Sequence, residues 1–179
     1  TVGAALEEVD ATVTILDNLL RIARAEAGVT SSDFSDTDLG QMVQDAADLY
    51  RPLAEARGVE LEVDAPTVVR PVERQLMAQA LTNLIDNALK YAPAHDGKVI
   101  ITVRELKDGR AVLSVQDNGP GIPKEDRERV IERFVRLEPS RQSDGAGLGL
   151  SLAASVARVH GGELNLADAN PGLRAGLVF

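Results

Sequence analysis

The stretch NLIDNALKY, residues 83–91, ends a helix that the sequence predicts from about Val72 to Tyr91. Apolar residues recur in this helix at intervals of three and four, as on a buried helix face, and they are Met77, Leu81, Leu84, Ile85 and Ala88. On a helical wheel Asn83, Asn87 and Lys90 fall within about 60° of one another, beside that apolar stripe. Amide oxygens suit Mg²⁺ and an ammonium group suits phosphate, so this face could hold a metal-bound nucleotide. The alternative is an ordinary solvated helix face.

The segments around this helix alternate between helical and strand patterns. A helix is expected at 39–57, capped by Asp36 or Thr37 and ended by Gly58, with an apolar face of Leu39, Val43, Ala46, Tyr50 and Leu53. A last helix is expected at 148–160, and strands are expected at 59–63, 99–105, 110–116, 162–167 and 173–179. Asp108-Gly109 between two alternating runs predicts a hairpin. This order predicts an α+β fold, with a mixed sheet covered on one face by helices.

Residues 1–27 show a coiled-coil pattern. Apolar side chains alternate at intervals of four and three through nearly four heptads, namely Val2, Leu6, Val9, Val13, Leu16, Leu20, Ala23 and Ala27. A second row, Ile15, Leu19 and Ile22, makes the apolar face wider than a two-helix seam. We therefore expect a long N-terminal helix that bundles with a second chain; the alternative is that it folds back on the main domain. The polar stretch 30–38 is expected to be a linker to a domain at 39–179.

The composition is that of a folded protein with an acidic surface. The 179 residues are 44% hydrophobic and 26% charged, with a formal net charge of −9. This charge argues against nucleic acid or an anionic membrane as a partner, because both reward basic surfaces. No apolar run approaches the roughly 20 residues that cross a bilayer, and the absence of cysteine fits a reducing compartment. We expect a cytoplasmic segment, although a longer parent protein could be anchored in the inner membrane.

Two glycine-rich stretches are further candidates for a binding site. DNGPGIP, residues 117–123, follows a predicted strand, and Asp117 there could accept a hydrogen bond from the exocyclic amine of adenine. GAGLGL, residues 145–150, opens the last helix, where exposed backbone N–H groups form an anion site. A plain turn is the alternative for the first stretch, and a flexible hinge for the second.

Four motifs in this order resemble the conserved boxes of sensor histidine kinases. Residues 83–91 look like the N box, 117–121 like the first glycine box, 134–136 like the F box, and 145–149 like the second glycine box. The family's fold is the Bergerat ATP-binding sandwich, which has two layers, one of strands and one of helices. Residues 1–29 are similar to the second helix of the family's dimerisation and phosphoacceptor bundle.

The resemblance implies a site for ATP and Mg²⁺. Asn83 and Asn87 would hold Mg²⁺, while Lys90 and Tyr91 would lie near the phosphates or ribose. Asp117 would bind adenine, in a pocket that Gly119, Gly121 and Ile122 border. Residues from about 122 to 144 would form a mobile lid. Phe134 would anchor this lid, Arg136 would reach the γ-phosphate, and the phosphates would be bordered by Gly145, Gly147, Leu148 and Gly149.

The implied activity is phosphoryl transfer from ATP to a histidine, for relay to a response-regulator receiver domain, in a homodimer formed through the N-terminal helix. Hydrolytic relatives carry Glu where this chain has Asn83, and an amide cannot act as a general base, so transfer is favoured over hydrolysis. Neither histidine is the expected acceptor. His95 lies in a predicted loop, and His160 lies at a helix end, where a cation favours the helix dipole. The alternatives are a serine kinase of the anti-sigma type and a non-catalytic dimerisation or docking module.

Overall fold

The computed structural model describes residues 33–132, 135 and 148–179. Its helices are α2 (Leu39–Ala56), α3 (Arg74–Tyr91) and α4 (Gly149–Val159), with short 3-10 turns η2 (Lys124–Asp126) and η3 (Arg129–Ile131). Its strands are β1 (Ser35–Asp38), β2 (Val59–Asp64), β3 (Val69–Val72), β4 (Gly97–Glu105), β5 (Ala111–Asp117), β6 (Glu163–Asp168) and β7 (Leu173–Val178). The helix expected at 1–29 lies outside the described residues.

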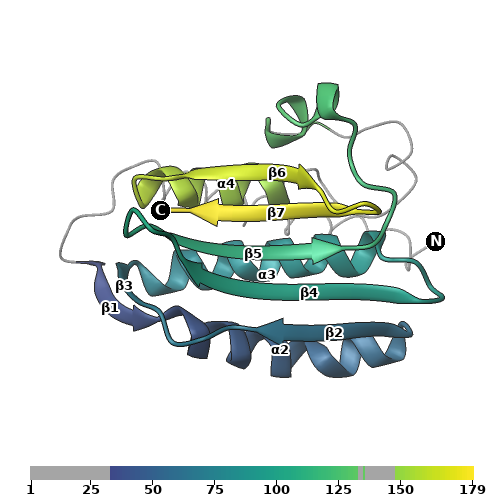
Figure 1. Ribbon diagram of the computed structural model, residues 1–179, viewed down its shortest axis with the longest axis horizontal. Helices are drawn as coiled ribbons and strands as arrows, with labels where there is room; N and C mark the ends of the chain where they lie inside the picture. Colours follow the sequence, from purple (N-terminus) through teal and green to yellow (C-terminus); the bar gives the residue numbers. More distant parts are fainter. Residues whose placement is uncertain (1–32, 133–134, 136–147) are drawn as a thin grey trace, which may run out of the picture.

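The five-stranded sheet is mixed, as predicted. Its strand order is β2-β4-β5-β7-β6, with β2 and β4 parallel and the remaining neighbours antiparallel. Figure 1 shows α2, α3 and α4 together on one face of this sheet. The predicted hairpin is confirmed, because Glu105 pairs with Ala111 across a turn in which Gly109 has a φ of 85°. The result is the two-layer α+β sandwich that the sequence indicates.

The core lies between the helices and the sheet, and it consists of the apolar side chains that recur with the helical and strand periodicities. On β4, Val99, Ile101 and Val103 alternate with partly exposed residues, so every second side chain points into the helix layer. On α3 the five apolar residues of the predicted stripe are all buried. The carboxylate of Glu73 caps α3, with its two oxygens accepting from the backbone N–H groups of Gln75 and Leu76.

Two strands were not expected from the sequence. β1 lies within the stretch expected to be a linker, and it pairs with β3 in a separate two-stranded antiparallel sheet. The segment of β1 is almost wholly polar, and β3 contains Pro71, so neither shows the alternation that marks a strand. The cap of α2 is Asp38 and not Asp36 or Thr37, because the Asp38 carboxylate accepts from the Gly40 N–H at 2.9 Å.

The predicted inner face of α2 was wrong at Leu53. Leu53 is 40% exposed and Leu49 is 74% exposed, while the buried positions of this helix include Met42, Ala47 and Ala54. The buried stripe is therefore rotated by about one residue at the C-terminal end of the helix. No helix in the described part of the chain is long and apolar enough to cross a membrane.

The rotated stripe leads to a stability prediction. Leu49→Gln and Leu53→Gln should each change the free energy of unfolding by less than about 0.5 kcal/mol, as exposed substitutions usually do. Val43→Ala on the same helix is the matched control, and it should destabilise by more than about 1 kcal/mol because Val43 is fully buried. Urea denaturation measures both. A loss at Leu53 as large as that at Val43 would contradict the rotation.

Candidate functional site

The second half of α3 presents its polar side chains to the start of α4. The Asn83 amide donates to the carbonyl oxygen of Gln79 at 2.9 Å, which fixes the orientation of this side chain. A Cβ placed on Gly149 would lie 3.3 Å from Asn87 Nδ2 and 3.7 Å from Asn83 Oδ1. The structure thus brings together Asn83, Asn87 and Gly149, which the sequence analysis had assigned to two separate motifs. The glycine at 149 thus lets the start of α4 approach both amides closely.

The N-terminus of α4 contributes backbone donors at this point. Leu148 is its N-cap residue and makes no side-chain cap hydrogen bond. Within the described residues no side chain caps this helix, so its first N–H groups can face an anion. The Leu148 side chain is 2% exposed and belongs to the hydrophobic core, so only its backbone could border a phosphate.

Asp117 lies at the end of β5, where it is only 6% exposed. Its Oδ1 accepts from the backbone N–H of Gly119 at 2.8 Å and of Leu173 at 3.4 Å. Burial raises the pKa of this carboxyl above its ordinary value, and these two hydrogen bonds only partly offset that effect. Because Oδ1 is used to hold two turns, Oδ2 is the oxygen that can face a ligand.

Close backbone contacts join Asp117 to the end of α3. A Cβ on Gly119 would lie 2.3 Å from the carbonyl oxygen of Tyr91, so this turn packs directly on the last residue of the helix. Tyr91 is 37% exposed, and its ring centroid lies 5.5 Å from Lys90 Nζ. Figure 1 shows that β5 and α3 end at the same end of the molecule, and α4 begins beside the second half of α3, where Gly149 lies next to Asn83 and Asn87. The candidate site is therefore one region.

Asn118 is a structural member of this region that the sequence analysis did not single out. Its Oδ1 accepts from the Lys98 N–H and its Nδ2 donates to the Asp96 carbonyl oxygen, both at 2.7 Å. The side chain thereby extends the β4–β5 ladder by one step and ties the loop after α3 to the Asp117 turn. An Asn within a glycine-rich turn is too common to mark this role in a sequence.

The remaining predicted residues divide into two groups. Ile122 is half-buried, and its carbonyl oxygen accepts from Arg127 Nε at 3.0 Å, which places it at the exit of the Asp117 turn. Gly121 adopts a φ of 71° in the same turn. The predicted sites at Phe134, Arg136, Gly145 and Gly147 lie outside the described residues.

Comparison with known proteins agrees with this arrangement. Residues 72–177, more than half of the chain, match the family described as "Histidine kinase-, DNA gyrase B-, and HSP90-like ATPase". The chain belongs to this family. The resemblance found in the sequence motifs is thus confirmed, and the fold that it implied is the one observed.

Individual relatives are sensor kinases. The chain is 32% identical over 152 residues to the adaptive-response sensory kinase SasA of Rippkaea orientalis, a match that covers 84% of this chain and 39% of that protein. The structure of full-length ShkA in complex with AMPPNP superposes with a TM-score of 0.80 at 27% identity, covering 98% of this chain and 37% of ShkA. The mycobacterial sensor histidine kinase MprB superposes with a TM-score of 0.69 at 29% identity, covering 82% and 96%. This chain thus spans well under half of SasA and of full-length ShkA.

Proposed function

We propose that this chain is the ATP-binding catalytic part of a sensor histidine kinase, and that it binds ATP together with Mg²⁺. The observation that carries the proposal is the meeting of Asn83 and Asn87 with the start of α4, together with a buried Asp117 whose turn packs on the end of α3. Amide oxygens, helix N–H groups and a carboxylate match the metal, the phosphates and the base of one nucleotide. The sensor kinases among the relatives support the same reading of the site.

Asp117 would recognise the adenine ring. Its Oδ2 accepts a hydrogen bond from the exocyclic amine, while Oδ1 remains bound to the backbone of both turns. A hydrogen bond to an ionised carboxylate contributes about 1.5 to 3 kcal/mol, which corresponds to roughly a 10- to 100-fold gain in affinity. The base is thereby oriented with its phosphates toward the start of α4.

Asn83 and Asn87 would hold Mg²⁺ through their amide oxygens, and Lys90 would add a positive charge near the phosphates. Bound Mg²⁺ neutralises phosphate charge that develops during transfer. The residues of this chain position the reactants: the α4 N–H groups orient the phosphates, and no side chain of the Glu type stands at position 83 to activate water. This favours transfer of the γ-phosphate to a protein nucleophile over hydrolysis.

The acceptor would be a histidine other than the two in this chain. Both ring nitrogens of His160 are engaged, Nδ1 with the Val156 carbonyl oxygen at 2.7 Å and Nε2 with the Glu73 N–H at 3.0 Å. His95 lies exposed in the loop after α3. In the transfer, the bond between the γ-phosphorus and its bridging oxygen breaks, a nitrogen–phosphorus bond forms on the acceptor, and ADP leaves.

The wider context of the proposal follows from the family. A homodimer would form through the heptads of residues 1–27, which lie outside the described residues. The phosphorylated histidine would pass its phosphate to a response-regulator receiver domain. We place this chemistry in the cytoplasm, where the absence of cysteine also fits.

Asp117→Asn tests the nucleotide site. The asparagine keeps an acceptor for Gly119 and Leu173 but places an amide donor toward the adenine amine, so ATP affinity should fall by roughly 10- to 100-fold. Wild-type affinity should also weaken as the pH is lowered through the pKa of Asp117, because protonation removes the acceptor, and burial raises this pKa above its ordinary value. Calorimetry with Mg²⁺ and a non-hydrolysable ATP analogue measures both effects.

Asp108→Asn is the matched control, since Asp108 lies in the β4–β5 turn and is exposed. It should leave nucleotide affinity unchanged. No binding by the wild type at millimolar nucleotide, or equal binding by wild type and Asp117→Asn, would end the proposal of an ATP site. Label from γ-labelled ATP on His95 or His160 would contradict the proposal that the acceptor lies elsewhere.

A further inference from the structure

Arg127 joins two turns that lie far apart in the sequence. Its Nε donates to the Ile122 carbonyl oxygen at 3.0 Å, and its terminal NH2 group lies 2.8 Å from Asp168 Oδ1. Ile122 follows the Asp117 turn, and Asp168 ends β6 at the start of the turn into β7. One planar guanidinium thus fixes the distance between both turns.

The same two turns also meet at Asp117. Gly119 in the first turn and Leu173 after the second both donate to Asp117 Oδ1. The two backbones are in close contact nearby, because a Cβ on Gly121 would lie 2.9 Å from the Gly172 carbonyl oxygen. Arg127 and Asp117 therefore connect the same pair of turns at two separate points, and the position of each turn affects the direction of the Asp117 carboxylate.

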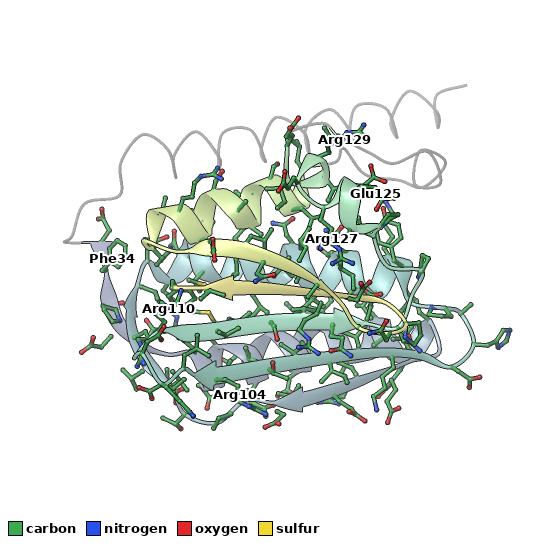
Figure 2. The ribbon with its side chains drawn as sticks, turned by 45° about the horizontal axis from the view of Figure 1, so that its top comes forward. Phe34, Arg104, Arg110, Glu125, Arg127 and Arg129 are labelled. Carbon is green, nitrogen blue, oxygen red and sulfur yellow. The ribbon has the colours of Figure 1, made fainter. Side chains whose placement is uncertain are left out.

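The Arg127 side chain is held more firmly than an ordinary surface arginine. It is 15% exposed, the lowest value for the basic partner of any ion pair in the described part of the chain. Arg129, two residues later, is 65% exposed, and among the described residues it pairs with Asp126 alone, within the same segment, at 3.0 Å. Figure 2 shows Arg127 directed from this segment toward the sheet, and Arg129 on the outer side.

We propose that Arg127 is a positioning residue for base recognition: by holding the two turns together through Ile122 and Asp168, it aims Asp117 at the exocyclic amine of adenine. The inference rests on the proposed nucleotide site and adds a determinant of its selectivity. Arg127 itself does not touch the nucleotide. Its loss would leave the phosphate-binding residues of α3 and α4 in place while the carboxylate loses its fixed direction.

Selectivity between ATP and inosine triphosphate separates this role from a general structural one. Inosine carries an oxygen where adenine carries its amine, and a carboxylate that accepts from the amine should discriminate strongly between them. Arg127→Ala should weaken ATP binding but change inosine triphosphate binding little, so the affinity ratio should fall at least about fivefold. Arg129→Ala, the matched control on the same segment, should keep the wild-type ratio, because its exposed ion pair contributes little.

Two further variants test the proposal, and the first of them, Asp168→Asn, does so even if Arg127→Ala folds poorly. Asp168 is the exposed partner in the ion pair with Arg127, and Asp168→Asn removes the charge that holds Arg127. This variant should also lower the ratio of ATP affinity to inosine triphosphate affinity. Adding Arg127→Ala to Asp117→Asn should cause no further fall in the ratio, since the arginine acts through the carboxylate. An equal loss for both nucleotides, or an unchanged ratio in Arg127→Ala and Asp168→Asn, would overturn the inference. Failure of the wild type to bind either nucleotide would overturn the proposed function and this inference together.

Discussion

Gly172→Ala should destabilise the protein by about 2 to 5 kcal/mol and abolish nucleotide binding. Gly172 has a φ of 106°, a conformation that a residue with a side chain adopts only under strain. Its Cβ would lie 1.9 Å from the Asp117 carbonyl oxygen and 2.6 Å from the carbon of that carbonyl. Both clashing atoms belong to the backbone, so relief requires the β6–β7 turn to move away from the residue that we expect to bind adenine.

Gly109→Ala is the matched control for this variant. Gly109 has a φ of 85°, yet apart from its two chain neighbours no described residue has an atom within 4 Å of the position that its Cβ would take. Alanine there should show the conformational strain alone, about 1 to 3 kcal/mol, with nucleotide affinity unchanged. Urea denaturation and calorimetry with an ATP analogue measure the two effects. Equal losses of stability in both variants, or nucleotide binding by a folded Gly172→Ala protein, would contradict this account.

The sequence is most informative where one periodicity persists. The stripe on α3 continues for more than three turns, which locates its buried side and, on the neighbouring face, Asn83 and Asn87. Short elements lack such redundancy. β1 and β3 have four residues each. They are strands because they pair with each other, although they lie more than thirty residues apart in the sequence. No local sequence pattern predicts a pairing partner at that distance.

The site shows the same limit at particular residues. Asp117 could be singled out, because an acidic residue in a glycine-rich turn after a strand has a recognisable pattern. Arg127 and Asp168 could not, since their meeting depends on the β6–β7 turn folding against the exit of the Asp117 turn. In the sequence Arg127 is one of several charged residues that follow Pro123, and nothing distinguishes it from Arg129.

His160 is a case in which the residue was placed correctly but its chemistry was not. The sequence predicts a cation at the end of the last helix, and His160 is indeed the C-cap of α4. Its Nε2, however, accepts from the Glu73 N–H, so the ring is neutral in this arrangement. Burial lowers the pKa of His160 below its ordinary value, although the Val156 carbonyl and the nearby Glu73 carboxylate oppose the shift. The ring therefore links the end of α4 to the start of α3 as a neutral bridge.

This bridge should make the stability of the protein depend on pH. Because the folded pKa lies below the ordinary value, the unfolded chain binds more protons between these two pKa values. The free energy of unfolding should therefore be fully retained above about pH 6.5 and should fall as the pH drops below it. The pKa values of Asp86 and Asp117 are raised, so these two carboxyl groups affect the free energy of unfolding in the opposite direction. Their contribution to stability is lost as the pH rises from the ordinary carboxyl pKa through the raised values. A comparison of variants at each pH is needed to isolate His160.

His160→Gln should reduce the slope of stability against pH below 6.5, because glutamine can donate and accept hydrogen bonds but does not titrate. His160→Ala should destabilise at neutral pH by about 1 to 3 kcal/mol, since the Glu73 N–H then loses its acceptor. It also removes the ring contacts to Phe34 and Phe179, at centroid distances of 5.1 and 5.8 Å. The exposed His95→Gln is the control and should preserve both the slope and the stability. Urea denaturation from pH 5 to 8 decides: an unchanged slope in His160→Gln would mean that His160 does not carry the dependence.

Because α3 bears Asn83 and Asn87 and α4 begins beside them, loss of the bridge should also weaken nucleotide binding at the opposite end of this helix pair.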